Sequence, residues 1–118
     1  SCPLPGSKVT QRLHGHNGVD LGAPSGTPIR AAAGGTVIIN RANGAWNGGY
    51  GNFIVLLHSN GTQTLYSHMS RSVVQAGETV SKNQTIGYVG MTGLTTGPHL
   101  HLEVRGAGNP FTDQSLCR

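Results

Sequence analysis

Charged and aromatic residues are scarce in this sequence. Charged residues make up 10% and aromatic residues 5% of the 118 residues, whereas ordinary globular chains are roughly 25% charged. The eight basic residues never stand next to one another, although nucleic-acid-binding proteins gather theirs on one patch or helix. The composition therefore argues against a nucleic-acid partner, while the net charge of +4 is compatible with a mild attraction to an anionic surface.

Helical periodicity and long apolar runs are also absent. No segment keeps apolar residues at helical spacing over three turns, and no run approaches the length of a membrane span. With 19 glycines and many Val, Ile and Thr, the chain favours short strands joined by tight turns. Strands are expected at 29–32, 36–39 and 53–58, and Asn60-Gly61 predicts a hairpin turn into 62–68. Residues 1–13 are interpreted as an irregular lead-in, and the prediction is an all-β, mostly antiparallel fold.

Only two cysteines are present, Cys2 and Cys117, one at each end. A chain of this length forms one domain over residues 1–118, and the termini of compact domains often lie close together. A Cys2–Cys117 disulfide is therefore expected, with two unrelated thiols as the alternative. A disulfide would imply an oxidising, extracytoplasmic compartment. No signal peptide is visible, so we expect a mature form or an excised domain.

The segment 97–104 carries the most unusual pattern in the chain. By the two-residue period of a strand, His99, His101 and Glu103 share one face, while apolar residues alternate with them on the other. The apolar face suits a core. The polar face puts two imidazoles, about 7 Å apart, and a carboxylate in one row, and our hypothesis is that one imidazole binds a metal while the other works beside it.

A second group of possible metal ligands lies near the start of the chain. His16 and Asp20 stand four residues apart, and Asp20 alternates with apolar neighbours and so faces away from the core. Together with His101 they make a set of two imidazoles and one carboxylate. This set is typical of catalytic zinc, and it leaves the fourth tetrahedral position for water. The chain contains no His-Glu-x-x-His, so the glutamate base of that motif is unavailable.

Three segments together resemble the motifs of the lysostaphin/LytM-type zinc peptidoglycan endopeptidases, which include LasA and beta-lytic relatives. They are His-Asn-Gly-Val-Asp at 16–20, Tyr-Ser-His-Met-Ser at 66–70 and Gly-Pro-His-Leu-His-Leu-Glu at 97–103. The resemblance covers a core of about residues 13–105. It implies a two-sheet antiparallel sandwich of the duplicated hybrid motif type, with a groove walled by loops.

Carried over by position, the resemblance implies that His16, Asp20 and His101 bind one Zn²⁺. It implies that His99 is the general base and that His68 orients or stabilises the oxyanion and shares the proton transfers. The expected substrate is the peptide stem or cross-bridge of bacterial peptidoglycan, cut at a Gly-Gly or D-Ala-type bond. We expect a secreted or cell-surface protein that is a monomer.

Several residues remain open to more than one interpretation. His14 is an extra imidazole that either competes for metal or lines the cleft, and His58 is interpreted as structural. Glu103 is either the partner that orients a zinc-bound imidazole or an ordinary carboxylate on the strand face. Trp46 and Tyr50, in a glycine-rich loop, are interpreted as groove-wall or loop-packing residues rather than as chemical groups.

Two alternatives to an active endopeptidase follow from the sequence. One is a catalytically silent module on the same fold that binds the wall or regulates an amidase. Such a module would be expected to lose some of the five site residues, and all five are present. The other is a biotinyl- or lipoyl-like carrier, for which Lys82 would have to be the modified residue; it lacks flanking methionines.

Overall fold

The computed structural model describes residues 2–14, 17–42, 44, 46–93, 95, 97–112 and 114–117. Within them lie the strands β1 (Lys8–His14), β2 (Gly18–Gly22), β3 (Pro28–Arg30), β4 (Gly35–Asn40), β5 (Asn52–Leu57), β6 (Gln63–Ser72), β7 (Thr79–Val80), β8 (Thr85–Val89) and β9 (His99–Arg105), and the 3₁₀ helices η1 (Asn47–Gly49), η2 (Pro110–Thr112) and η3 (Gln114–Cys117). No helix among these residues is long and apolar enough to cross a membrane. The prediction of an all-β chain is confirmed.

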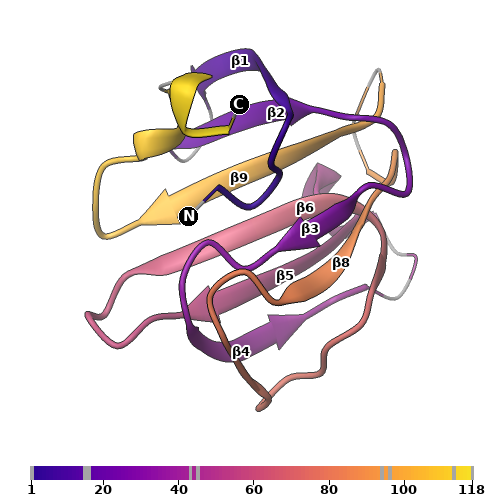
Figure 1. Ribbon diagram of the computed structural model, residues 1–118. Helices are drawn as coiled ribbons and strands as arrows, with labels where there is room; N and C mark the ends of the chain where they lie inside the picture. The colour runs from indigo at the N-terminus through magenta and orange to yellow at the C-terminus, as the bar shows by residue number, and fades with distance from the viewer. Residues whose placement is uncertain are drawn as a thin grey trace.

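The strands form an antiparallel sheet in the order β1-β2-β9-β6-β5-β4-β7. A second, smaller layer is made by β3 and β8, which pair with each other and cross one face of this sheet (Figure 1). The two layers are joined because β8 also pairs with the end of β6. The predicted hairpin at Asn60-Gly61 connects β5 to β6, and Gly61 has a φ of +85°, a conformation open to glycine at little cost.

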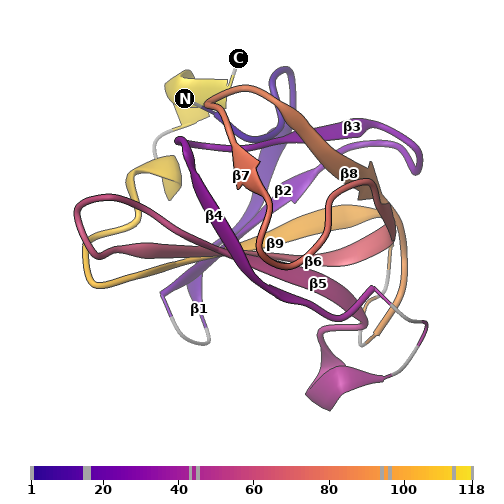
Figure 2. The same cartoon turned by 90° about the horizontal axis from the view of Figure 1, so that it is seen from below.

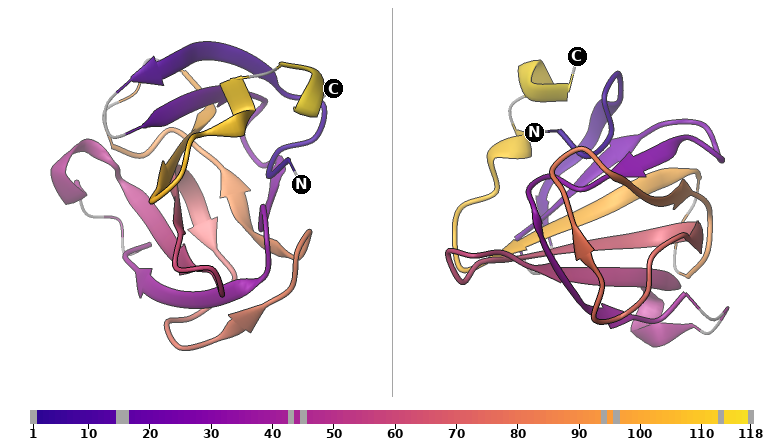
Figure 3. Two further views of the ribbon diagram at one scale, coloured as in Figure 1. Left: turned by 90° about the vertical axis from the view of Figure 1, so that its left-hand side faces the viewer. Right: turned by 60° about the horizontal axis from the view of Figure 1, so that its bottom comes forward.

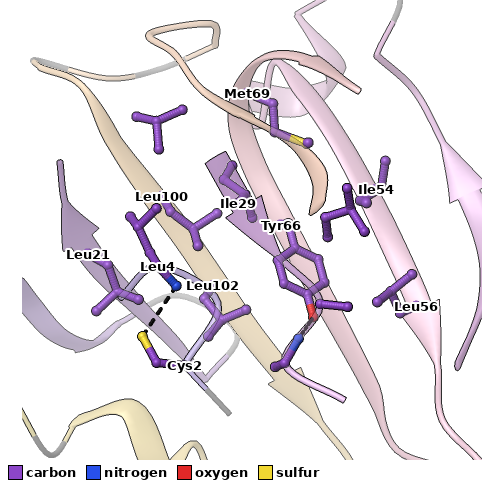
Figure 4. Close-up of a cluster of buried hydrophobic side chains, with 14 of the residues drawn as sticks. Cys2, Leu4, Leu21, Ile29, Ile54, Leu56, Tyr66, Met69, Leu100 and Leu102 are labelled. Carbon is purple, nitrogen blue, oxygen red and sulfur yellow. Dashed lines mark hydrogen bonds between the residues drawn. The ribbon is translucent and has the colours of Figure 1, made fainter. Parts of the chain in front are cut away.

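The hydrophobic core lies between the main sheet and the β3–β8 layer. Leu100 and Leu102 of β9 face Ile29 of β3 and are fully buried with it (Figure 4). Burying one such side chain stabilises the fold by about 1.5–3 kcal/mol. The two-residue period therefore turns the alternate residues of β9 to the opposite face of the sheet.

That opposite face carries a smaller apolar cluster of Phe53, Val55 and Leu65, with Tyr50 packed against it. The helix η1, next to Tyr50 in sequence, lies on the other side of the main sheet from β3 (Figure 2). The face opposite the core is thus partly covered by the loop that carries η1. The remainder of this face holds the polar side chains of β2 and β9.

The irregular lead-in expected over residues 1–13 is wrong from residue 8 onward, because residues 8–14 form β1 along the edge of the sheet next to β2. Two register shifts interrupt this pairing, between Val9 and Gln11 and between Gln11 and His14. Such bulges break the alternation of side chains. The two-residue period that marks a strand is therefore missing from this part of the sequence.

The segments near the two ends of the chain lie close together, and η3 contacts β1 (Figure 1, Figure 3). Cys2 and Cys117 form the expected disulfide, with their Cα atoms 5.3 Å apart. Two backbone hydrogen bonds hold the same region, from Gly6 to Cys117 and from Arg30 to Pro3. Closing so long a loop stabilises the fold by up to about 4–5 kcal/mol in the chain-entropy account.

We expect a double variant, Cys2→Ser with Cys117→Ser, to lose up to about 4–5 kcal/mol of unfolding free energy in guanidinium titrations. Wild-type protein treated with reductant is the matched control and should unfold at the same denaturant concentration as the variant. Two thiols reacting in denatured, unreduced wild-type protein would contradict the disulfide. An unchanged midpoint in the variant would contradict its contribution to stability.

A buried polar chain crosses the core at the end of β5. Tyr66 is fully buried, and its oxygen accepts a hydrogen bond from the Ala32 backbone N–H at 3.0 Å. The Thr64 hydroxyl lies 2.8 Å from the Tyr66 oxygen and 2.8 Å from His58 Nε2, and His58 Nδ1 donates to the Gly34 carbonyl at 2.8 Å. Both nitrogens of His58 are thus bonded to the scaffold, which agrees with its structural interpretation.

Burial raises the pKa of Tyr66 from 10.0 to about 12, against the hydrogen bonds from Thr64 and Ala32. The unfolded chain therefore releases this proton at lower pH than the folded protein. The contribution of Tyr66 to stability is fully present below pH 10 and is lost as the pH rises toward 12.

We expect the unfolding free energy of wild-type protein to fall more steeply between pH 10 and 12 than that of Tyr66→Phe. Denaturant titrations across this range measure it, and tyrosinate absorbance should show one fewer late ionisation in the variant. Tyr88→Phe, on the half-buried Tyr88, is the matched control. Equal slopes for wild type and Tyr66→Phe would refute the shift.

Candidate active site

Pairing of β2 with β9 places Asp20 directly opposite His101. His101 Nδ1 and Asp20 Oδ1 are 2.9 Å apart, and both residues are buried. Their neighbours Leu21 and Leu100, also paired, are fully buried in the core on the other face. The predicted outward direction of Asp20 therefore follows from the same alternation that buries the leucines.

His101 lies between two carboxylates. Its Nε2 is 3.0 Å from Glu103 Oε2, and because a carboxylate oxygen can only accept, Nε2 carries a hydrogen. Burial alone would lower the pKa of His101, but the hydrogen bonds to Asp20 and Glu103 outweigh it and raise the pKa to about 9. A divalent cation beside Asp20 would take the place of the second proton, on Nδ1.

His99 lies two residues before His101 on the same face. Its Nδ1 is 2.9 Å from the Gly97 carbonyl oxygen and 3.0 Å from Thr95 Oγ1. Since a carbonyl only accepts, Nδ1 donates, and the neutral ring keeps its lone pair on Nε2. That Nε2 is 3.6 Å from Asp20 Oδ2. The nitrogen suited to accept a proton thus faces the carboxylate next to His101.

His68 reaches the same place through a bulge in β6. Tyr66 pairs with Ile54 and Met69 with Asn52, so three steps along β6 face two along β5. His68 lies inside the bulge with a φ of +60°, which is rare for a side chain of this size. As a result its ring centroid lies 4.8 Å from that of His99.

Backbone groups fix the protonation of His68. Its Nδ1 donates to the Thr92 carbonyl at 2.7 Å, which leaves the lone pair of the neutral ring on Nε2. Burial lowers the pKa of His68, and the neighbouring His99 and His101 act in the same direction, against the Thr92 bond and Asp20. His68 is therefore a neutral imidazole near neutral pH.

Glu103 is 1% exposed and accepts three hydrogen bonds. The donors are His101, the Tyr50 hydroxyl and Arg105. Burial alone would raise the pKa of Glu103, but these bonds outweigh it and hold the pKa below its usual value. Burial and the Glu103 carboxylate raise the pKa of Tyr50 to about 12, so Tyr50 remains a donor. Of the two interpretations of Glu103, its contacts agree with the partner of His101.

The interpretation of Tyr50 as groove-wall packing describes only part of its contacts. Its ring packs on Phe53 with centroids 5.2 Å apart, but its hydroxyl also reaches Glu103. The loop that carries Tyr50 packs with its backbone directly against the backbone at Thr92, since a Cβ on Gly51 would lie 2.3 Å from the Thr92 carbonyl carbon. In the sequence, this close packing is indicated only by the high density of glycine in the loop.

The donor atoms of Asp20 and His101 fit a divalent metal. Two ligand atoms that are each about 2.0–2.1 Å from one tetrahedral ion lie roughly 3.3 Å apart. His101 Nδ1 and Asp20 Oδ1, now 2.9 Å apart, would have to move apart only slightly to bind one ion. Among the residues that the structure describes, no group of three possible ligands converges. His16, expected as the third, lies outside the described residues, as does the side chain of His14.

A cavity of about 280 Å³ opens beside these residues, lined by Thr10, Gln11, Asp20, Gly97, Pro98 and His99. Its position next to Asp20 and His99 allows a substrate to reach both. A larger hollow of about 940 Å³ is lined in part by His58. It shares no lining residue with the cavity beside Asp20 and His99. Trp46 is 59% exposed, which agrees with its expected place in a loop.

Comparison with known proteins gives sequence relatives over most of the chain. It is 45% identical to the DD-carboxypeptidase/endopeptidase Mpg of Neisseria meningitidis over 108 residues, which are 92% of this chain and 24% of that protein. It is 43% identical to the peptidoglycan DD-endopeptidase ShyA of Vibrio cholerae over 103 residues, 86% of this chain and 23% of that protein. The chain thus spans about a quarter of the length of these relatives.

Solved structures of the same shape include lysostaphin from Staphylococcus simulans, with a TM-score of 0.82 and 29% identity over 99% of this chain and 52% of that one. A mutant of the catalytic domain of the prophage-encoded M23 protein EnpA from Enterococcus faecalis has a TM-score of 0.74 and 32% identity over 88% of this chain and 85% of that one. The model of Peptidase family M23 matches residues 14–112. The chain belongs to peptidase family M23.

Proposed function

We propose that this chain is a zinc-dependent endopeptidase that hydrolyses peptide cross-bridges of bacterial peptidoglycan at Gly-Gly or D-Ala-type bonds. The observation that carries the proposal is the 2.9 Å approach of His101 Nδ1 to Asp20 Oδ1, with His99 Nε2 3.6 Å from the same carboxylate. The name of ShyA, a peptidoglycan DD-endopeptidase, supports a peptidoglycan substrate, and that of Mpg supports endopeptidase activity. The disulfide supports an extracytoplasmic location.

Asp20 and His101 hold the zinc ion together with His16, whose role rests on the match to the family motif alone. The ion, when bound, polarises the scissile carbonyl and lowers the pKa of water. Glu103 keeps the hydrogen of His101 on Nε2, so that Nδ1 is the nitrogen left for the metal. Neither carboxylate has to change its protonation for this arrangement.

His99 acts as the general base. Its Nδ1–H is bonded to the Gly97 carbonyl, so Nε2 accepts the proton of the attacking water and passes it to the leaving amine. His68 has the same arrangement, with Nδ1–H bonded to the Thr92 carbonyl. A neutral His68 cannot donate from Nε2, so it stabilises an oxyanion only after it has taken a proton. Sharing the proton transfers is therefore the role that its tautomer favours.

Variants that lack a proposed metal ligand and variants that lack the proposed base should differ in how much zinc they hold. We expect His101→Ala and Asp20→Ala to lose both zinc and activity. We expect His99→Ala to keep zinc and to lose turnover by roughly 10²–10⁴-fold, the usual size of a general-base contribution. Elemental analysis of purified variants measures the first quantity and peptide hydrolysis the second. A zinc-free His99→Ala would reverse the assignment of His99 and His101.

Digestion of purified cell walls from several bacterial species tests the activity itself. We expect new amino termini within the cross-bridges, and mass analysis of the released peptides identifies the bond. His99→Ala protein, once elemental analysis has shown that it holds zinc, is the matched control. Wall binding by zinc-loaded wild-type protein without any new amino terminus would support the silent wall-binding or amidase-regulating module instead.

A further inference from the structure

Both oxygens of the buried Glu103 carboxylate have donors. Oε2 accepts from His101 Nε2 at 3.0 Å and from the Tyr50 hydroxyl, and Oε1 accepts from Arg105 at 3.1 Å. A buried carboxylate is costly unless hydrogen bonds replace its hydration, and here three donors do so. The Arg105 side chain is 41% exposed and reaches only Oε1. The two contacts on Oε2 hold the carboxylate in place.

A neutral imidazole can offer one nitrogen to a cation only if the other nitrogen holds the hydrogen. His101 has a carboxylate at each nitrogen, Asp20 Oδ1 2.9 Å from Nδ1 and Glu103 Oε2 3.0 Å from Nε2. With Asp20 bonded to a cation, Glu103 is the acceptor that remains, and it holds the hydrogen on Nε2. Without Glu103, Asp20 Oδ1, 2.9 Å from Nδ1, would be the acceptor left for the ring, and it would favour the hydrogen on Nδ1, the nitrogen that the cation needs. The cost of moving that hydrogen to Nε2 would then be taken from the free energy of binding the cation.

Tyr50 connects this pair to the other side of the site. Its hydroxyl bonds Glu103, its ring centroid lies 6.0 Å from that of His101, and its backbone carbonyl accepts from the His68 backbone N–H at 2.9 Å. The same residue therefore restrains Glu103 through its side chain and His68 through its backbone. Tyr50 follows η1 directly, so the loop over this face of the sheet is attached to both histidines.

We propose that Glu103, held by Tyr50, is a positioning residue that fixes His101 with its hydrogen on Nε2 and its Nδ1 lone pair directed at the cation held by Asp20. This inference rests on the proposed function only in requiring a metal at Asp20 and His101. Glu103 does not contact the substrate in this account. It acts through the ring of His101.

The test compares zinc affinity, by competition with a chromophoric chelator, in wild type, Glu103→Gln and Glu103→Ala. We expect Glu103→Ala to bind zinc about 10–100-fold more weakly. Glu103→Gln should be intermediate, because its amide oxygen can still accept from His101 and Tyr50. Nitrogen-15 NMR of the zinc-loaded protein should show the hydrogen of His101 on Nε2 in wild type and in Glu103→Gln. The exposed Glu78 supplies the matched control, Glu78→Ala, with wild-type affinity expected.

Tyr50→Phe provides a milder variant that removes one donor and keeps the ring. It should weaken zinc binding in the same direction as Glu103→Ala, with Tyr88→Phe as its control, and it decides the matter together with the wild-type NMR spectrum if Glu103→Ala does not fold. A folded Glu103→Ala with wild-type affinity, or a hydrogen on Nδ1 of zinc-loaded His101, would overturn the inference alone. Wild-type protein that binds no zinc would overturn the proposed function and this inference with it.

Discussion

The site depends on the register between β2 and β9. Asp20 pairs with His101 and Leu21 with Leu100, so the same register brings the two proposed metal ligands together and buries two leucines. A slip of one residue would turn the carboxylate into the core and the leucines to solvent. With about 1.5–3 kcal/mol for each buried leucine and a further cost for a buried carboxylate, the core holds the polar pair in place.

The third imidazole requires a departure from regular strand geometry. Tyr66 and Met69 both lie in the core, three residues apart, and only a bulge allows that in a strand. His68 takes the positive φ, at a cost of order 1–3 kcal/mol. Backbone bonds at both its N–H and its C=O, to Tyr50 and Gly90, and the ring bond to Thr92 compensate for that strain. The strain is thus located at the residue that the site requires.

The sequence predicts those parts of the structure that follow a local rule. The alternation over 97–104 gives both faces of β9, the neighbours of Asp20 give its direction, and the position of the cysteines gives the disulfide. It misses β1, where two bulges remove the alternation. It also misses the hydrogen bond from the Tyr50 hydroxyl to Glu103. That contact joins a glycine-rich loop to a strand 53 residues away, and a periodic pattern within one segment does not predict such a contact.

Which nitrogen of each histidine carries the hydrogen explains how a His-x-His pair can hold two different roles. His99 and His101 have the same side chain and share a face of β9. The acceptor near His99 Nδ1 is the Gly97 carbonyl, so its basic nitrogen is Nε2. His101 has Glu103 at Nε2 and Asp20 at Nδ1, so a cation bound by Asp20 would meet Nδ1. The different acceptors beside the two rings therefore support the proposed division between a ligand and a base.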